Sequence, residues 1–256
     1  MNSSVSGSQR QQKVGGIAAL YLAAAFVVAM PFFLVFVKYP DVVDPVEKVA
    51  LLVRNHDSMR IMYLITYVLF GIVLAVLALA LHARLRDRAP ALTQAATAVG
   101  LIWAVMLVAS GMIFNAGMTA VVDLHGADPA QAVAAWQSIE PVAQGLGGSG
   151  GELLGGLWVL LVSVAALRTG GLSKALNWLG VAIGAAGVLS VVPALNDVAY
   201  GFGLLVIVWF AWLGVAMLRT TSRAASFASI TETTPAPAAA SSTPRPSSSQ
   251  PSPMPS

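Results

Sequence analysis

The sequence predicts an all-α, polytopic membrane protein with six transmembrane helices and with both termini on the cytoplasmic side. Hydrophobic residues make up 57% of the 256 positions and charged residues only 10%, with a mean hydropathy of +0.78. Six apolar segments are each long enough to cross about 30 Å of hydrocarbon. Lys and Arg flank these segments in alternation, which is typical of a chain that crosses a bilayer repeatedly.

A transmembrane domain is expected over residues 14–219. A spanning helix needs about 20 mostly apolar residues, because each residue rises about 1.5 Å and no water satisfies the backbone inside the bilayer. The first run stays uncharged through Phe36, longer than the roughly 7–15 residues of a signal-peptide core, so an uncleaved anchor kinked at Pro31 is favoured. We predict spans at residues 14–37, 60–82, 98–122, 146–168, 175–195 and 198–218.

Basic residues orient the chain, because Lys and Arg in short loops stay on the cytoplasmic side. The opposite side carries most of the acidic residues. This pattern places both ends inside a bacterial-type cytoplasmic (inner) membrane. The residues that share the side of the N-terminus are Arg10, Lys13, Arg84, Arg86, Arg88, Arg168, Lys174, Arg219 and Arg223.

Two loops on the outer side carry start signals for short helices. Asp44-Pro45 and Asp128-Pro129 each combine a capping residue with a proline suited to the first helical turn. The first segment, over residues 45–53, is expected to lie along the outer membrane face, and Trp136 in the second suits the headgroup layer. Simple loop packing is the open alternative.

The two ends of the chain lack the apolar content of a packed core. Residues 1–13 are predicted to be a disordered cytoplasmic N-terminus. Residues 220–256, rich in Ala, Ser and Pro, are predicted to be a disordered cytoplasmic tail.

Glu152 is the one ionisable residue inside an apolar span. Intramembrane carboxyls are costly, so it is either a proton carrier or cation site, or a structural acid that fixes its helix to neighbouring helices. We expect a buried polar cluster of Glu152, Asn115, Ser149, Asn196, Asp197 and Arg60, with helix packing at Gly145, Gly148, Gly155 and Gly156.

The segment Gly147-Gly148-Ser149-Gly150 resembles the GxSG pattern around the nucleophile of rhomboid intramembrane proteases. That resemblance implies a serine hydrolase in which a histidine of the sixth helix acts as the base. The three histidines here, His56, His82 and His125, all lie outside the sixth helix. A glycine-rich packing surface is the favoured interpretation.

Other chemistries find little support in the sequence. With no cysteine, disulfides and thiolate metal sites are excluded, and the scattered histidines do not suit a metal or haem. The basic residues form no stripe, so no nucleic-acid partner is expected, and no motif predicts a cofactor. The expected partners are the lipid bilayer and either another membrane protein or a second copy of the chain.

The chain as a whole resembles a bacterial integral-membrane family defined only as domain of unknown function 4386. The resemblance rests on residues 13–18, residues 45–53 and Leu176-Asn177-Trp178-Leu179-Gly180 at the start of the fifth span. It implies no catalytic residues. We therefore expect a non-enzymatic structural or partner-binding membrane module. A small-solute or proton-coupled permease using Glu152, and more remotely a hydrolase using Ser149, are the alternatives.

Overall fold

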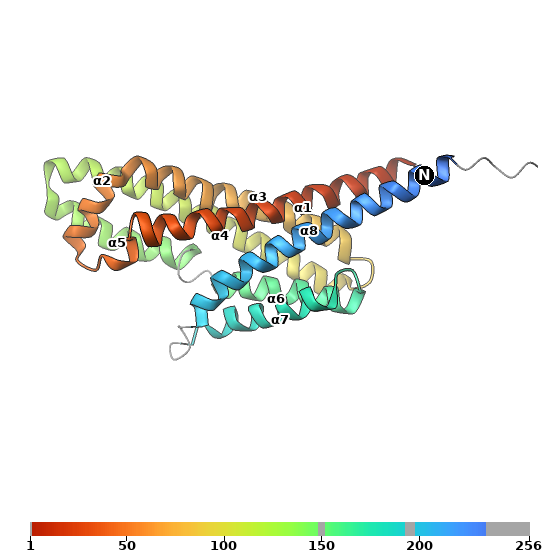
Figure 1. The fold of residues 1–256 in the computed structure, drawn as a ribbon. Helices are drawn as coiled ribbons and strands as arrows, with labels where there is room; N and C mark the ends of the chain where they lie inside the picture. Colours follow the sequence, from red (N-terminus) through yellow and green to blue (C-terminus); the bar gives the residue numbers. More distant parts are fainter. Residues whose placement is uncertain (1, 148–151, 193–197, 234–256) are drawn as a thin grey trace, which may run out of the picture.

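The computed structural model describes residues 2–147, 152–192 and 198–233. Every regular element in these ranges is a helix and none is a strand, so the expected all-α class is confirmed. The helices form an elongated bundle (Figure 1). In chain order they are α1 (Asn2–Pro31), the π-helical turn η1 (Phe32–Phe36), the 3-10 turn η2 (Tyr39–Asp41), α2 (Pro45–Tyr63), the π-helical segment η3 (Leu64–Leu69), α3 (Phe70–Leu85), α4 (Pro90–Ala127), α5 (Pro129–Gly147), α6 (Glu152–Thr169), α7 (Lys174–Leu189) and α8 (Val198–Thr233).

Four helical stretches in the described ranges are long and apolar enough to cross a membrane. They are Gln9–Phe36, Pro45–Leu85, Pro90–Ala127 and Phe202–Arg219. The two other predicted spans correspond to the shorter apolar helices Leu153–Thr169 and Lys174–Leu189. At about 1.5 Å per residue these shorter helices cover about 24–26 Å, a few ångströms less than a typical hydrocarbon core.

Both ends of the bundle depart from the sequence prediction. Residues 2–13 and 220–233, expected to be disordered, belong to α1 and α8. Extending an existing helix avoids the cost of nucleation, so Ser, Gln and Ala residues can continue a helix that longer apolar side chains establish. The first proline of the tail is Pro235, just beyond the end of α8.

The segment that begins at Pro45 is not a separate surface helix. This corrects the prediction of a short helix over residues 45–53. It continues through η3 into α3 as one helical stretch to Leu85, bent at Asn55, where φ is −112° and ψ is 16°. The side-chain amide of Asn55 donates to the Leu51 carbonyl at 3.0 Å, and Ser58 Oγ donates to the Asn55 carbonyl at 2.9 Å. Figure 1 shows the first part of α2 running across the end of the bundle before the chain turns toward α3.

Helix α4 packs against α2, α3, α5 and α6. Its 38 residues extend about 57 Å, well beyond the roughly 30 Å of a hydrocarbon core. Gly100, in its N-terminal half, faces Trp158 of α6, whereas Gly117, in its C-terminal half, faces Ile139 of α5. One helix therefore contributes to two separate cores.

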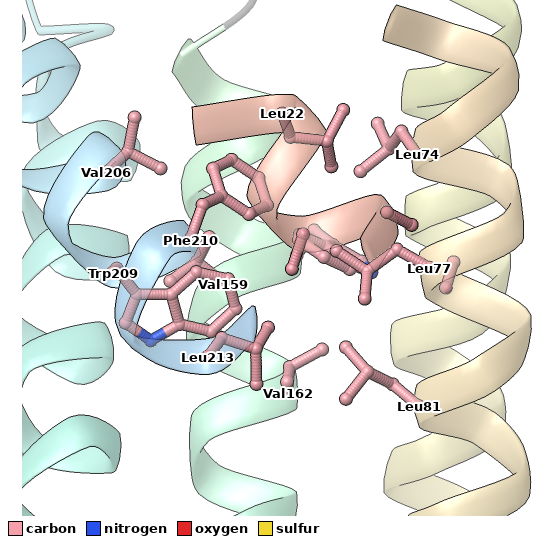
Figure 2. Close-up of a cluster of buried hydrophobic side chains, with 14 of the residues drawn as sticks. Leu22, Leu74, Leu77, Leu81, Val159, Val162, Val206, Trp209, Phe210 and Leu213 are labelled. Atoms are coloured by element: carbon pink, nitrogen blue, oxygen red, sulfur yellow. The ribbon is translucent and has the colours of Figure 1, made fainter. Parts of the chain in front are cut away.

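The main core joins α1, α3, α4, α6, α7 and α8. Aliphatic side chains from several helices meet around the rings of α8 (Figure 2). Three indoles form a row through it, with centroid distances of 5.8 Å from Trp103 to Trp158 and 5.9 Å from Trp158 to Trp209. Large rings thus fill the spaces between helices α4, α6 and α8.

The outer core lies at the other end of α4 and is built by η2, α2, α4 and α5. Its rings are in direct contact, with Tyr63 stacked on Phe114 at 4.4 Å and Phe114 at 6.2 Å from Trp136. We call η2, α2, α5 and residues 114–127 of α4 the outer cap. The buried residues of the outer core are Val37, Tyr39, Val49, Leu51, Leu52, Met59, Tyr63, Phe114, Met118, Val121, Ala132, Trp136 and Ala143.

Glycines allow the closest helix crossings. A Cβ atom at Gly156 of α6 would lie 2.8 Å from the Gly187 Cα and 2.9 Å from the Gly184 carbonyl of α7. A Cβ atom at Gly16 of α1 would lie 3.1 Å from the Gly214 carbonyl of α8. Small residues let helix backbones approach closely, which is the main source of packing between apolar helices in lipid.

Replacement of Gly156 by Ala is expected to destabilise the bundle by about 1–3 kcal/mol, because the neighbouring atoms are backbone and the helices must separate. Gly145→Ala is the matched control, since a Cβ atom there meets nothing within 4 Å. In a helix, that change should be neutral or stabilise by up to about 1 kcal/mol. Thermal unfolding in detergent measures the stability of both variants. Equal losses of stability would contradict the close crossing of α6 and α7.

Candidate functional site

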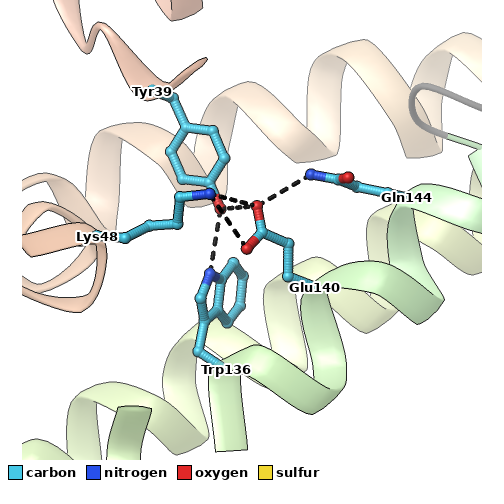
Figure 3. Close-up of polar contacts among 5 residues, drawn as sticks. All are labelled: Tyr39, Lys48, Trp136, Glu140 and Gln144. Carbon is cyan, nitrogen blue, oxygen red and sulfur yellow. Dashed lines mark hydrogen bonds and ion pairs between the residues drawn. The ribbon is translucent and has the colours of Figure 1, made fainter. Parts of the chain in front are cut away.

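Five side chains of the outer cap form a polar cluster around one carboxylate, called the Glu140 cluster (Figure 3). Glu140 Oε1 accepts hydrogen bonds from the Tyr39 hydroxyl at 2.8 Å, Lys48 Nζ at 3.1 Å and Gln144 Nε2 at 2.9 Å. Trp136 Nε1 donates to the Tyr39 oxygen at 3.1 Å. The members are Tyr39, Lys48, Trp136, Glu140 and Gln144.

Local helix signals place these residues. Asp44 caps α2 by accepting from the Glu47 amide at 2.9 Å, so Lys48 lies at the end of the first turn. Asp128 caps α5 by accepting from the amides of Ala130 and Gln131 at 3.0 and 3.1 Å.

The three members on α5 share one helix face. Trp136, Glu140 and Gln144 are spaced four residues apart, a separation that brings side chains onto the same side of an α-helix. Tyr39 comes from η2 instead, directly after Lys38, the one described non-glycine residue with a positive φ, at 54°. The turn at Lys38 brings the chain back over α5.

The cluster is largely shielded from solvent. The side chains of Lys48 and Glu140 are 20% and 13% exposed, and Tyr39 and Trp136 are buried. Burial first, and the neighbouring Glu140 charge second, raise the pKa of the Tyr39 hydroxyl far above its ordinary value. The hydroxyl therefore keeps its proton and donates a hydrogen bond to the carboxylate. The Lys48 ammonium also lies 5.0 Å from the centroid of the Tyr39 ring.

This geometry holds the carboxylate in place and occupies its Oε1 oxygen. Glu140 Oε1 has three donors, and Lys48 Nζ also reaches Oε2 at 3.4 Å. The opposite charges balance each other. The cluster joins α5 to η2 and α2, which lie about a hundred residues earlier in the sequence.

Sequence reasoning did not find this cluster. The sequence singles out neither Glu140 nor Lys48, and its pattern predicts Trp136 in the headgroup layer. Trp136 is instead 1% exposed within the outer core, which corrects that prediction. The four-residue spacing of Trp136, Glu140 and Gln144 was visible in the sequence. The pairing of Glu140 with Lys48 spans 92 positions and has no local signal.

Most of the predicted polar cluster cannot be compared with the structure. Ser149, Asn196 and Asp197 lie outside the described residues, as does the side chain of Glu152, whose backbone begins α6. Asn115 and Arg60 are described and share no hydrogen bond or ion pair with each other.

The two described members have different environments. Asn115 Nδ2 donates to the Gly111 carbonyl at 2.8 Å within its own helix, and its Oδ1 is buried without a partner among the described residues. Arg60 is exposed.

The four glycines predicted for helix packing have different surroundings. Gly145 is exposed on α5, and a Cβ atom there would meet nothing within 4 Å. Gly155 faces the Trp103 ring and Gly156 faces α7. Gly148 lies outside the described residues.

Within the described ranges, no group of three or more His, Asp or Glu side chains is arranged to hold a metal ion. No family model matches this sequence, and comparisons with curated proteins and with solved structures give no match. The resemblance to domain of unknown function 4386 therefore stays a prediction.

Glu140→Gln is expected to lower the free energy of unfolding by about 3 kcal/mol, because Lys48 then loses its counter-charge in a shielded site. Adding Lys48→Met to that variant should recover part of the loss, since the unpaired charge is then gone. Glu47→Gln, at an exposed glutamate of the same segment, is the control. Thermal unfolding in detergent is the measurement, and additive losses in the double variant would argue against a direct pair.

Proposed function

We propose that this chain is a six-span protein of a bacterial-type cytoplasmic membrane, with both termini cytoplasmic and the outer cap outside. In this proposal α6 and α7 cross the bilayer together with the four longer helical stretches. The role is non-enzymatic, that of a structural or partner-binding module. The partner is another membrane protein or a second copy of the chain, and it meets the outer cap.

The arrangement of the basic turns supports this topology. Arg84, at the end of α3, donates from Nη2 to the Gly171 carbonyl at 2.8 Å. Arg88, before α4, donates to the Thr169 carbonyl at 2.8 Å. The α3–α4 and α6–α7 turns therefore lie at the same end of the bundle, where Figure 1 also places the N-terminal end of α1 and the C-terminal end of α8. Basic residues gathered at one end favour that end as the cytoplasmic one.

The Glu140 cluster is the single observation that carries the non-enzymatic role. A catalytic acid or nucleophile needs a reactive atom that faces a substrate, whereas the Glu140 carboxylate is occupied by donors from within the chain. Together with the outer core, the cluster gives the cap a fixed shape outside the bilayer. A fixed, folded surface is suited to holding a partner.

Cysteine labelling tests the topology, since the chain has no cysteine of its own. Single cysteines at Val43, Gln131 and Val192 should react with a membrane-impermeant maleimide in intact cells. Cysteines at Asp87 and Lys174 should react only after permeabilisation, because both positions lie beside the basic turns. Labelling of Lys174→Cys in intact cells would reduce the number of spans to four, and protection of Val192→Cys would contradict the proposed topology.

Proton flux separates the proposed module from the permease alternative. Proteoliposomes that contain the protein and a trapped pH-sensitive dye should show the same proton leak as empty liposomes. Glu152→Gln should leave that leak unchanged, because a module has no transport to lose. A flux in the wild-type protein that Glu152→Gln abolishes, with folding intact, would overturn the proposed role and establish the permease.

A further inference from the structure

At one end of the bundle Arg84 and Arg88 both donate to the α6–α7 turn, which Arg168 and Lys174 flank in sequence. Lys13 follows Gln12, the residue of α1 to which Arg84 also donates. We propose that this group, called the inner basic cluster, binds the phosphate headgroup of an anionic phospholipid of the cytoplasmic leaflet. The inference rests on the proposed membrane placement. The members of the cluster are Lys13, Arg84, Arg88, Arg168 and Lys174.

Arg84 and Arg88 are held in position by neutral groups. Arg84 donates to the Gly171 carbonyl from Nε at 3.2 Å and from Nη2 at 2.8 Å, and its Nη1 donates to the Gln12 side-chain oxygen of α1. Arg88 Nη1 donates to the Thr169 carbonyl. These bonds orient both guanidinium groups toward one turn, and each guanidinium has more N–H groups than the bonds use.

The positive charge of this cluster is not neutralised within the described part of the chain. Carbonyl and amide oxygens accept hydrogen bonds but carry no net charge. At this end, the one described ion pair joins Arg86 to Asp87 at 3.6 Å, and both of those side chains are well exposed. Arg84 is partly buried without a carboxylate, so its charge calls for an anion from outside the chain.

The tendency of Lys and Arg to stay in the cytoplasm explains why these residues are present, but not how they are arranged. Topology signals require only charge near a helix end. Here a planar guanidinium is fixed between α1, α3 and the α6–α7 turn, an arrangement that suits the oxygens of a phosphate. Basic pockets between helices on the cytoplasmic side are the usual form of a lipid headgroup site.

A lipid fits this place better than a soluble phosphate. The cluster lies at the end of α3, whose outer surface exposes Ile72, Val76 and Leu79. These residues are spaced for one helix face, which acyl chains can cover while the headgroup meets the cations. A soluble phosphate would use the cations alone and leave that face without a partner.

Native mass spectrometry of the full chain in detergent tests the proposal. Phosphatidylglycerol should be retained well above phosphatidylcholine with the same acyl chains. Arg168→Gln, which removes an exposed cation without breaking a described hydrogen bond, should lower phosphatidylglycerol retention about fivefold, the effect expected for one cation near an anionic surface. Arg84→Gln should lower it at least as much.

Arg54→Gln is the matched control, because Arg54 is exposed on the outer cap. It should leave phosphatidylglycerol retention unchanged. Equal retention of the two lipids, or an equal loss in Arg54→Gln and Arg168→Gln, would overturn the lipid site. Competition by soluble glycerol phosphate at the same concentration as the lipid would replace it with a site for free phosphate.

Lipid binding in detergent does not depend on how the chain is oriented in a membrane. Failure of the proposed lipid site is therefore distinguishable from failure of the proposed topology. Loss of lipid selectivity with the expected cysteine labelling overturns only the lipid site. Reversed labelling overturns the topology and moves any measured headgroup site to the other leaflet, which would overturn the assignment to the cytoplasmic side.

Discussion

The constraint on which this structure depends is the need of an apolar chain to satisfy its own backbone. In hydrocarbon no water can pair with an exposed amide or carbonyl, and a helix is the element that bonds these groups within one segment. The long apolar runs of this chain are therefore helical, and even the irregular turns in them, η1 and η3, remain hydrogen-bonded helices. At Pro31 the α-helix α1 ends, and the wider π-helical turn η1 follows.

The two cores are stabilised by different physical effects. Between helices in lipid, apolar burial gives little advantage, so close approach at glycines such as Gly156 and filling by rings such as Trp158 hold the main core. In the outer cap, where the proposed topology places water, burial of Leu51, Leu52 and Trp136 is favourable at about 25 cal/mol per Å². The Glu140 cluster then selects one arrangement of the segments around that core.

Sequence reasoning was most successful where the signal is local. Apolar length located the apolar parts of α1, α3, α4, α6, α7 and α8, and the Asp-Pro pairs at Asp44 and Asp128 marked the starts of α2 and α5. It failed where the decisive partner is distant. The bend at Asn55 replaces an expected break because side-chain hydrogen bonds there support the backbone, and the pairing of Lys48 with Glu140 depends on how α2 and α5 fold together.

Because α4 belongs to both cores, the two ends of the molecule are coupled in their folding. Opening the main core would free the inner half of α4, and the same helix carries Phe114 and Met118 of the outer core. The protein should therefore unfold as one cooperative unit, in which a change of lipid or detergent around the main core alters the stability of the outer cap. Through helix α4, the lipid around the main core thus affects the stability of the outer cap, and no ligand is needed for this effect.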